Sequence, residues 1–255
     1  MTGWTAILLA GSRPGMDPFA AAHGTDLKAL IPVGGVPMVR RPVDALLASE
    51  HVAAVRVLTQ QPERIGAVLP AHPKLSVDQS HGTIAATLAA LCTDPATPWP
   101  LLVTTADHAL LDESMIADFC ELAAGTMIAV AVVDRASLEA LLPEARRTWI
   151  PFKDGAYSGA NLFALGGKEA LPAIAMWRAV EQDRKKGWRL LWQLGPSLFL
   201  GALFRVLTLK QVLARVGRRL GLDVRPVVMS DPLACVDVDK QDDLDLAERL
   251  LAVRR

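Results

Sequence analysis

The stretch from Thr5 to Gly35 limits the choice of fold more than any other part of the chain. It begins with an uninterrupted apolar run, Ala6 to Ala10, which has the length of a strand and no polar face, as in a strand buried on both sides. The run ends at Gly11 in a loop that carries Ser12 and Arg13. Small residues, backbone N–H groups and a cation suit the binding of a polyphosphate. The stretch therefore predicts a buried first strand followed by a phosphate-binding loop.

Apolar strands and helical segments alternate along the chain that follows. We expect helices at 37–49, 65–69 and 84–91, and strands at 53–59, 75–77, 101–105, 127–133 and 156–165. This alternation predicts a mainly parallel sheet with helices on both of its faces.

Composition fits a globular enzyme and excludes several other classes. The length of 255 residues suits one large α/β domain, and 51% apolar residues with 21% charged ones are ample for a core. The net charge of zero gives no reason to expect a nucleic-acid partner. The three cysteines lack C-x-x-C spacing, so neither a metal site nor a disulfide framework is indicated. The N-terminal apolar run is too short for a signal peptide or a membrane span, so we expect a cytoplasmic protein.

The first loop resembles the signature of nucleotidyltransferases that share a Rossmann-like GT-A-type fold, usually written LAGG-x-R-M-G-x-D-K-x-L-L. The matching residues are Leu9, Ala10, Gly11, Arg13 and Lys28, followed by a matching segment at 29–38. Ser12 replaces the second glycine, and the loop as far as Asp26 is longer than usual. By this pattern the chain resembles the MobA-like NTP transferases. The resemblance implies an α/β Rossmann-like three-layer sandwich with a mixed, mostly parallel sheet. It would form a single domain over 1–255, with a helical insertion at 172–222.

A second informative feature is the acidic residue that follows the strand expected at 101–105. Asp107 stands where the carboxyl end of that strand meets solvent, which is where open α/β sheets bind their ligands. The resemblance implies that Asp107 is a ligand of Mg²⁺. The alternative is an N-cap for the next helix, and Asp112 suits that position better because Met115 follows it. His108 is a weaker candidate, since Mg²⁺ prefers oxygen ligands.

Two further turns carry candidate binding residues. The resemblance implies that the turn at Gly82 and Thr83 lies over the nucleotide base, and glycine allows such close approach. Thr83 could equally cap the helix that begins at Ile84. The resemblance also implies that Asn161 binds the acceptor, whereas a turn-stabilising asparagine is the simpler interpretation.

The end of the chain, from Leu233 to Leu244, resembles the late (D/N)-(I/V)-(D/N)-T-P-E-D-L element of the family, with Lys240 in place of threonine. In the family this strand returns to the sheet and supplies a second metal ligand. Alternation along a strand places Asp237 and Asp239 on the same side, so either could face the cation. A closing amphipathic helix is expected at 242–253.

The segment from 178 to 225 departs from the small members of the family. It contains eleven basic and three acidic residues, and the stretch at 190–209 is strongly apolar. Glycine, proline and Arg205 interrupt that stretch, so a membrane span is not expected. We expect helices packed on the main domain. The alternative is peripheral contact with an anionic membrane, or the binding of an anionic, partly apolar acceptor.

The chemistry that the resemblance implies is transfer of a nucleotidyl group from a nucleoside triphosphate to a phosphorylated small molecule or lipid headgroup, with Mg²⁺ as cofactor. Catalysis would fall to Arg13 and Lys28, metal binding to Asp107 with Asp237 or Asp239, and acceptor binding to Asn161. The expected nucleotide-binding residues are Leu9, Ala10, Gly11, Ser12, Gly82 and Thr83. The rival functions are a glycosyltransferase, which usually carries D-x-D where this chain has Thr105 before Asp107, and a non-catalytic nucleotide-binding protein.

Overall fold

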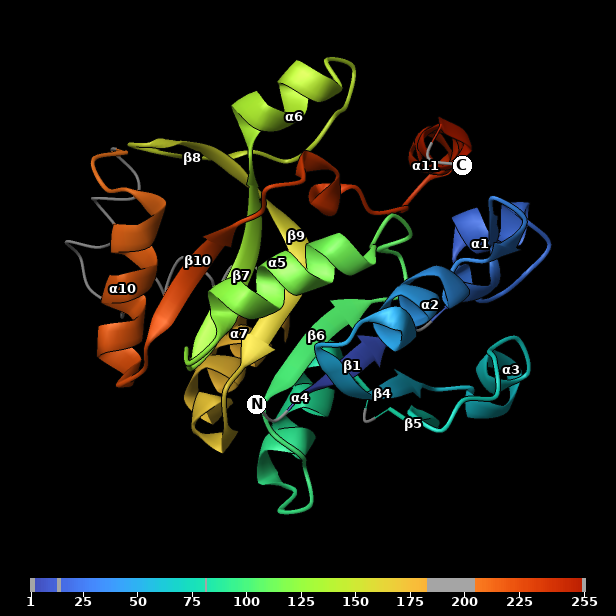
Figure 1. Cartoon of the computed structure of the whole chain (residues 1–255), viewed down its shortest axis with the longest axis horizontal. Helices are drawn as coiled ribbons and strands as arrows, with labels where there is room; N and C mark the ends of the chain where they lie inside the picture. The colour runs from blue at the N-terminus through green and yellow to red at the C-terminus, as the bar shows by residue number, and fades with distance from the viewer. Residues whose placement is uncertain (1–2, 13–14, 81, 183–204, 254–255) are drawn as a thin grey trace.

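The computed structural model describes residues 3–12, 15–80, 82–182 and 205–253, and its centre is an eight-stranded sheet. The strand order is β10-β7-β9-β6-β1-β4-β5, and β8 pairs with β9 outside this path (Figure 1). The strands are β1 (Trp4–Leu9), β4 (Val52–Thr59), β5 (Leu75–Gln79), β6 (Leu101–Thr105), β7 (Ile128–Asp134), β8 (Ile150–Phe152), β9 (Gly155–Leu165) and β10 (Val224–Val228). Strands β2 (Pro32–Val33) and β3 (Val36–Pro37) form a separate hairpin.

Most of the strand pairs are parallel. Strand β1 is parallel to β4 and β6, β4 is parallel to β5, and β7 is parallel to β10. Only β9 breaks the pattern within the described residues of this sheet, being antiparallel to β6, β7 and β8. The expected mixed, mostly parallel sheet is confirmed.

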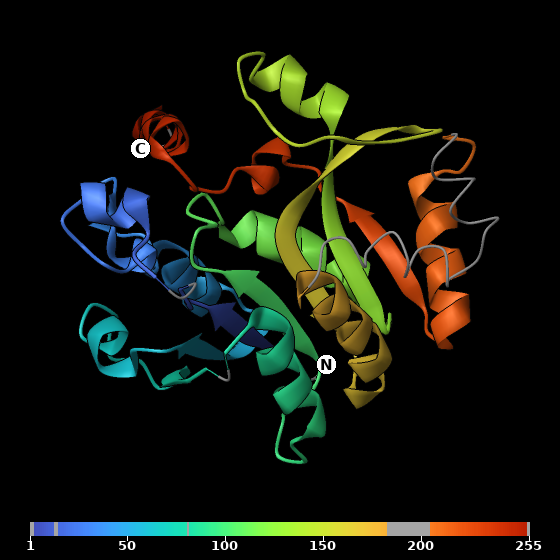
Figure 2. The same cartoon turned by 180° about the vertical axis from the view of Figure 1, so that it is seen from behind.

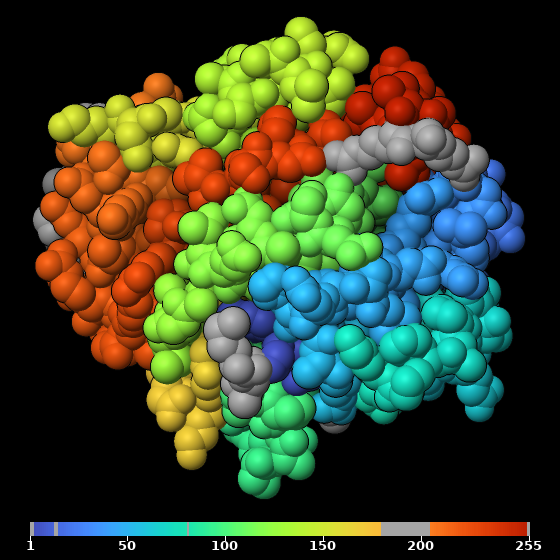
Figure 3. Space-filling model, viewed as in Figure 1, coloured from blue at the N-terminus to red at the C-terminus, as the bar shows by residue number. Residues whose placement is uncertain are grey.

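Helices cover both faces of the sheet, which makes three layers. Helices α2 (Arg40–Ala48) and α5 (Glu113–Ala123) lie over the face seen in Figure 1, and their surfaces cover much of it in Figure 3. Helices α4 (Ile84–Thr93) and α7 (Leu171–Gln182) lie over the opposite face (Figure 2). The remaining helices are α1 (Pro18–Ala22), α3 (Pro62–Gly66), α6 (Arg135–Leu141), α10 (Leu209–Leu220) and α11 (Gln241–Val253), with 3-10 turns at Lys28–Leu30, Lys168–Ala170 and Pro232–Cys235.

The first strand shows why its sequence has no polar face. Ala6 and Leu8 point into the apolar cluster beneath α2 and α5, whereas Ile7 and Leu9 point into the cluster beneath α4 and α7. All four side chains are buried, because successive residues of a strand face opposite sides and both sides are covered here. The apolar run from Ala6 is therefore the strand at the centre of the molecule.

The course of the chain around β1 also marks where a ligand binds. Strand β1 lies between β4 and β6. The chain reaches β4 through α2 on one face, and it reaches β6 through α4 on the other (Figures 1 and 2). In open α/β sheets ligands bind outside the carboxyl ends of the strands at such a change of side. The ends of β1 and β6 are the expected position of the site.

The part of the chain that differs most from expectation follows α7. Helices α7 and α10 confirm the helical prediction for the described parts of 172–222, whereas residues 183–204 lie outside the described residues. Strand β10 was not expected, since Arg225 and Pro226 interrupt its apolar pattern. Proline is tolerated there because β10 is an edge strand, paired only with β7 in the described structure. No helix in the described residues is long and apolar enough to cross a membrane.

Leu8 should be among the residues on which this core depends most. Its side chain is completely buried, so Leu8→Ala is expected to lower the free energy of unfolding by about 2–5 kcal/mol. Denaturant titration followed by circular dichroism measures this change. The matched control is Leu122→Ala on α5, where the leucine is 56% exposed and the expected change is within about 0.5 kcal/mol. Equal losses in the two variants would contradict the assignment of β1 to the core.

Candidate active site

Lys28 lies at the centre of a cluster of charged side chains at the carboxyl edge of the sheet. It begins the 3-10 turn Lys28–Leu30, and its Nζ donates to Asp107 Oδ2 at 2.8 Å. The same Nζ also contacts the carboxylate of Asp239. The side chain of Lys28 is only 20% exposed. One ammonium group thus joins three parts of the sequence that lie far apart.

Asp107 is held at the end of β6 by its neighbours. Ala106 N donates to Leu9 O at 3.0 Å, which ties the start of this turn to the end of β1. Thr105 donates its hydroxyl to Asp107 Oδ1, and Asp107 O accepts from Val238 N at 3.0 Å. The N-cap of α5 is Asp112 and not Asp107, since Asp112 Oδ1 accepts from Met115 N at 3.0 Å.

The two late aspartates do not lie on a strand, and this prediction was wrong. Residues 236–240, all of which the structure describes, have no regular secondary structure and follow the 3-10 turn Pro232–Cys235. Strand β10 ends at Val228, and Asp231 then caps the turn: its carboxylate accepts from Leu233 N at 2.8 Å. Strand β10, not this segment, is the strand that returns to the sheet.

Asp237 and Asp239 consequently have different partners. Asp239 contacts Lys28, whereas Asp237 accepts from Asn161 Nδ2 at 3.2 Å through Oδ2 and forms an ion pair with Arg147 through Oδ1. Asn161 has a φ of +48° beside an irregularity in the pairing of β9 with β7, which turns it toward Asp237. Arg147 was not expected from the sequence, because it lies in a loop and nothing in its neighbourhood marks it as a partner of a residue so distant.

The charges of the cluster shift the pKa values of its members. Burial acts to lower the pKa of Lys28, but Asp107 and Asp239 outweigh burial and raise it. Burial acts to raise the pKa of Asp107, but Lys28 lowers it overall. For Asp237, burial together with the charges of Asp239 and Asp107 raises the pKa despite the opposite effect of Arg147. The cluster therefore favours the charged form of Asp107 and disfavours that of Asp237.

His108 is next to Asp107 but faces the interior. Its side chain is completely buried, and its ring lies 3.4 Å from Thr104 Oγ1. Burial lowers the pKa of His108 to about 4, so the ring is neutral near pH 7. A buried neutral imidazole supports the turn after β6 and is not in a position to meet a ligand from solvent.

The phosphate-loop residues lie at the end of β1. The main chain of Leu9 and Ala10 is already paired with neighbouring strands, since Ala10 N donates to Leu58 O at 2.9 Å. Gln60 holds the loop after Gly11: its Oε1 accepts from Ser12 N at 2.9 Å, and its Nε2 donates to Ser12 O at 3.3 Å. Gln60 was not expected from the sequence. Arg13, the other predicted catalytic cation, lies outside the described residues.

Of the two interpretations of the turn before α4, the structure shows the capping role of Thr83. Thr83 is the N-cap of α4, and its hydroxyl accepts from Ala86 N at 3.2 Å. Gly82 has a φ of +93°, a conformation that few residues other than glycine adopt. The capping bond does not involve Gly82, which is exposed, so the base-binding hypothesis for this turn stays a prediction.

The chemistry of the cluster fits a hard divalent cation. Four carboxylates, on Asp107, Asp237, Asp239 and Asp243, surround two basic groups, those of Lys28 and Arg147, in the described part of the site. The excess of two negative charges and the oxygen donors suit Mg²⁺. No three His, Cys, Asp or Glu side chains among the described residues are arranged to hold a metal as they stand. A cation bound by Asp107 and Asp239 would take over contacts that Lys28 now makes.

Asp237→Asn should reveal the unfavourable burial of this carboxylate. Because the pKa of Asp237 is raised in the folded protein, the folded state holds its proton to higher pH, and the stability that this proton provides is lost as pH rises through the folded pKa. The variant has no carboxyl proton to lose, so its melting temperature relative to that of the wild type should increase as the pH rises above about 4, the ordinary pKa of an aspartate. Asp242→Asn, at an 84% exposed side chain, controls for the substitution itself. A relative decrease for Asp237→Asn would contradict the raised pKa.

Comparison with solved structures identifies several transferases with this fold. A hypothetical transferase from Thermus thermophilus is 28% identical, with a TM-score of 0.79 over 95% of this chain and 100% of its own. A nucleotidyl transferase from a Methanothermobacter species is 17% identical, with a TM-score of 0.54 over 99% and 100% of the two chains. The 2-C-methyl-D-erythritol 4-phosphate cytidylyltransferase from Thermus thermophilus is also 17% identical, with a TM-score of 0.51 over 98% and 100%.

The two structures at 17% identity show a shared fold only. Comparison with curated protein sequences finds no match. The model of the MobA-like NTP transferase domain matches residues 6–195, which include most of β1 together with Lys28, Asp107 and Asn161. The chain therefore belongs to the family of MobA-like NTP transferase domains.

Proposed function

We propose that this protein is a Mg²⁺-dependent nucleotidyltransferase that moves a nucleoside monophosphate from a nucleoside triphosphate to a phosphorylated acceptor. The observation that supports this most is the contact of Lys28 Nζ with both Asp107, which follows β6, and Asp239, which precedes α11. A cation beside paired carboxylates is the arrangement that a metal-bound triphosphate requires. Membership of the NTP transferase family supports the same class of reaction.

The reaction needs alignment and charge neutralisation more than covalent catalysis. An oxygen of the acceptor phosphate attacks the α-phosphorus, and the bond from that phosphorus to the bridging oxygen breaks, so that pyrophosphate leaves with the bonding electrons. An acceptor phosphate is ionised near neutral pH, so no general base is needed for the attack. Lys28 would stabilise the charge that develops on the α-phosphate and the leaving group. Arg13 is proposed to assist it.

Asp107 and Asp239 are the residues that we assign to the metal. Both face Lys28, and Asp239 is 64% exposed, so a cation can reach it from solvent. Asp237 has Arg147 on one carboxylate oxygen and Asn161 on the other, which makes it a support for the site. When bound, Mg²⁺ would neutralise the triphosphate and orient its α-phosphorus.

The nucleotide and the acceptor are assigned to opposite sides of Lys28. The triphosphate would lie along the loop after β1, residues 9–12, with the base against Gly82 and Thr83. The acceptor would lie toward β9, where Asn161 provides a polar side chain. A phosphorylated small molecule and a phosphorylated lipid headgroup both suit this side. Basic residues at 178–225 are proposed to contact such an acceptor or an anionic membrane surface.

Lys28→Ala and Asp107→Ala should each abolish most of the turnover while the protein stays folded. Loss of a charge that stabilises the transition state typically lowers kcat by about 10²–10³-fold, and loss of a metal ligand should do at least as much. The measurement is pyrophosphate release from each of the four ribonucleoside triphosphates with Mg²⁺ against a panel of phosphorylated acceptors. A thermal-shift screen with the same triphosphates selects the nucleotide first.

Lys168→Ala is the matched control, since Lys168 is exposed on the turn Lys168–Ala170 that precedes α7. It should retain wild-type turnover. Wild-type activity in either Lys28→Ala or Asp107→Ala would refute the assignment of the site. Turnover of a nucleotide-sugar without pyrophosphate release would instead identify a glycosyltransferase, and triphosphate binding without turnover would identify a binding protein.

A further inference from the structure

Arg147 makes more contacts with the late acidic segment than any function considered so far explains. It lies in the loop between α6 and β8, 90 residues before Asp237. One guanidinium nitrogen forms an ion pair with the Asp237 carboxylate. The other donates to Asp237 O at 3.2 Å and lies 3.8 Å from the carboxylate of Asp243. The side chain is only 10% exposed.

The segment that Arg147 contacts has no ladder of strand hydrogen bonds to hold it. Residues 236–240 are irregular, as the structure describes them, yet they place Asp239 opposite Asp107. Two hydrogen bonds from main-chain N–H groups help to hold the segment. Val238 N donates to Asp107 O at 3.0 Å, and Asp239 N donates to the side-chain oxygen Oδ2 of Asp243 at 3.3 Å. Arg147 contacts the residue before this pair, Asp237, and the acceptor of the second bond, Asp243.

The position of Asp239 therefore depends on two neighbouring carboxylates, those of Asp237 and Asp243, which need the Arg147 guanidinium between them. Asp237 and Asp243 are mostly buried, with side chains 26% and 11% exposed. A buried carboxylate left without a partner is costly, and two of them near each other would repel. Without the guanidinium, the segment would gain stability by moving these carboxylates toward solvent, and Asp239 would move with them.

We propose that Arg147 is a positioning residue of the nucleotidyl-transfer site, which holds Asp237 and Asp243 so that Asp239 faces Asp107 across the cation position. This inference rests on the proposed function. Arg147 acts through the acidic segment and does not itself touch the triphosphate or the metal. Partners that orient metal ligands typically contribute about 10–100-fold to metal affinity.

Arg147→Met tests this proposal through metal binding. Mn²⁺ affinity, measured by electron paramagnetic resonance with each of the four ribonucleoside triphosphates in turn, should fall about 10–100-fold in the variant. Triphosphate affinity without metal should be unchanged, since Lys28 and the loop after β1 are intact. Arg147→Lys should recover part of the loss, because an ammonium group keeps the charge but offers one nitrogen in place of the two with which the guanidinium contacts Asp237 and Asp243. Arg146→Met, at the exposed neighbouring arginine, should bind Mn²⁺ like the wild type.

A second variant covers the case in which Arg147→Met does not fold. The double variant Arg147→Met/Asp237→Asn removes both members of this ion pair, so that the Asp237 carboxylate is not left without its partner. It should fold and still bind Mn²⁺ weakly, because Asp243 remains unsupported. If Arg147→Met or the double variant folds and binds Mn²⁺ as tightly as the wild type, the positioning proposal is wrong, whereas the proposed function is unaffected. Failure of the wild-type protein to bind Mn²⁺ with any triphosphate would overturn the proposed function as well.

Discussion

The contact of one ammonium group with two carboxylates is the interaction on which the site depends. Lys28 comes from the 3-10 turn that follows α1, Asp107 from the end of β6, and Asp239 from the segment before α11. The two carboxylates would repel each other in this partly buried position without a cation between them. Lys28 supplies that cation when no metal is present. The same group is then close to any phosphate that arrives with a divalent ion, so the arrangement is prepared for its proposed substrate.

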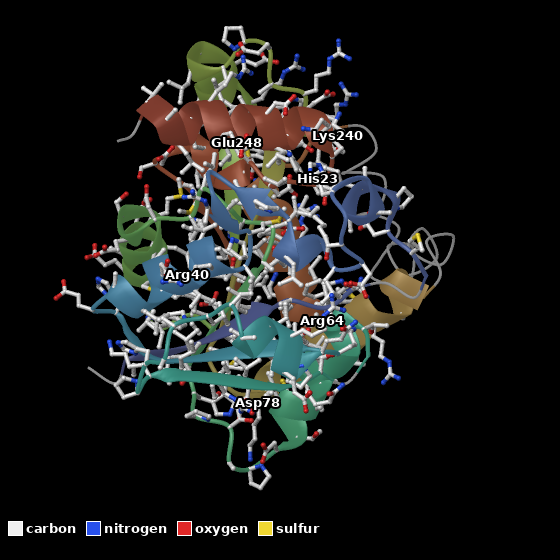
Figure 4. All side chains as sticks on the ribbon, turned by 90° about the vertical axis from the view of Figure 1, so that its right-hand side faces the viewer. His23, Arg40, Arg64, Asp78, Lys240 and Glu248 are labelled. Atoms are coloured by element: carbon white, nitrogen blue, oxygen red, sulfur yellow. The ribbon has the colours of Figure 1, made fainter. Side chains whose placement is uncertain are left out.

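Contacts far from the chemistry keep the first loop in place for this interaction. The carboxylate of Asp26 accepts two hydrogen bonds from Arg64, at 2.9 Å and 2.7 Å, which ties the loop to α3. His23 lies 2.9 Å from Gln241 Oε1 at the start of α11, and Gly34 N donates to Glu248 Oε1 at 3.0 Å. Figure 4 shows His23 beside the beginning of α11 and Glu248 farther along that helix. Helix α11 thus supports two parts of the chain on either side of Lys28, the end of α1 and the turn between β2 and β3.

The site includes an arrangement that lowers stability. Asp237 is partly buried near two other carboxylates, and its raised pKa shows that Arg147 does not fully offset the burial and these charges. A fold selected for stability alone would place a neutral side chain there, since each buried charge must recover its loss of hydration. Functional sites often retain such costs because the geometry of their charges is needed. In this protein the loss of stability arises in the same segment that carries Asp239.

The sequence by itself determined most of the central sheet and the place of Asp107 just after β6. The apolar runs of β1 and β6 predicted buried central strands, and the prediction held because strands covered on both faces leave an unbroken apolar pattern. Asp112 was recognisable as a cap because capping is local. Only the tertiary structure decided the relation between the late aspartates: they occupy an irregular segment in which the alternation of a strand does not apply. Arg147 and Gln60 also became visible only in three dimensions. Each acts on a segment far from it in sequence, and no local pattern encodes such a contact.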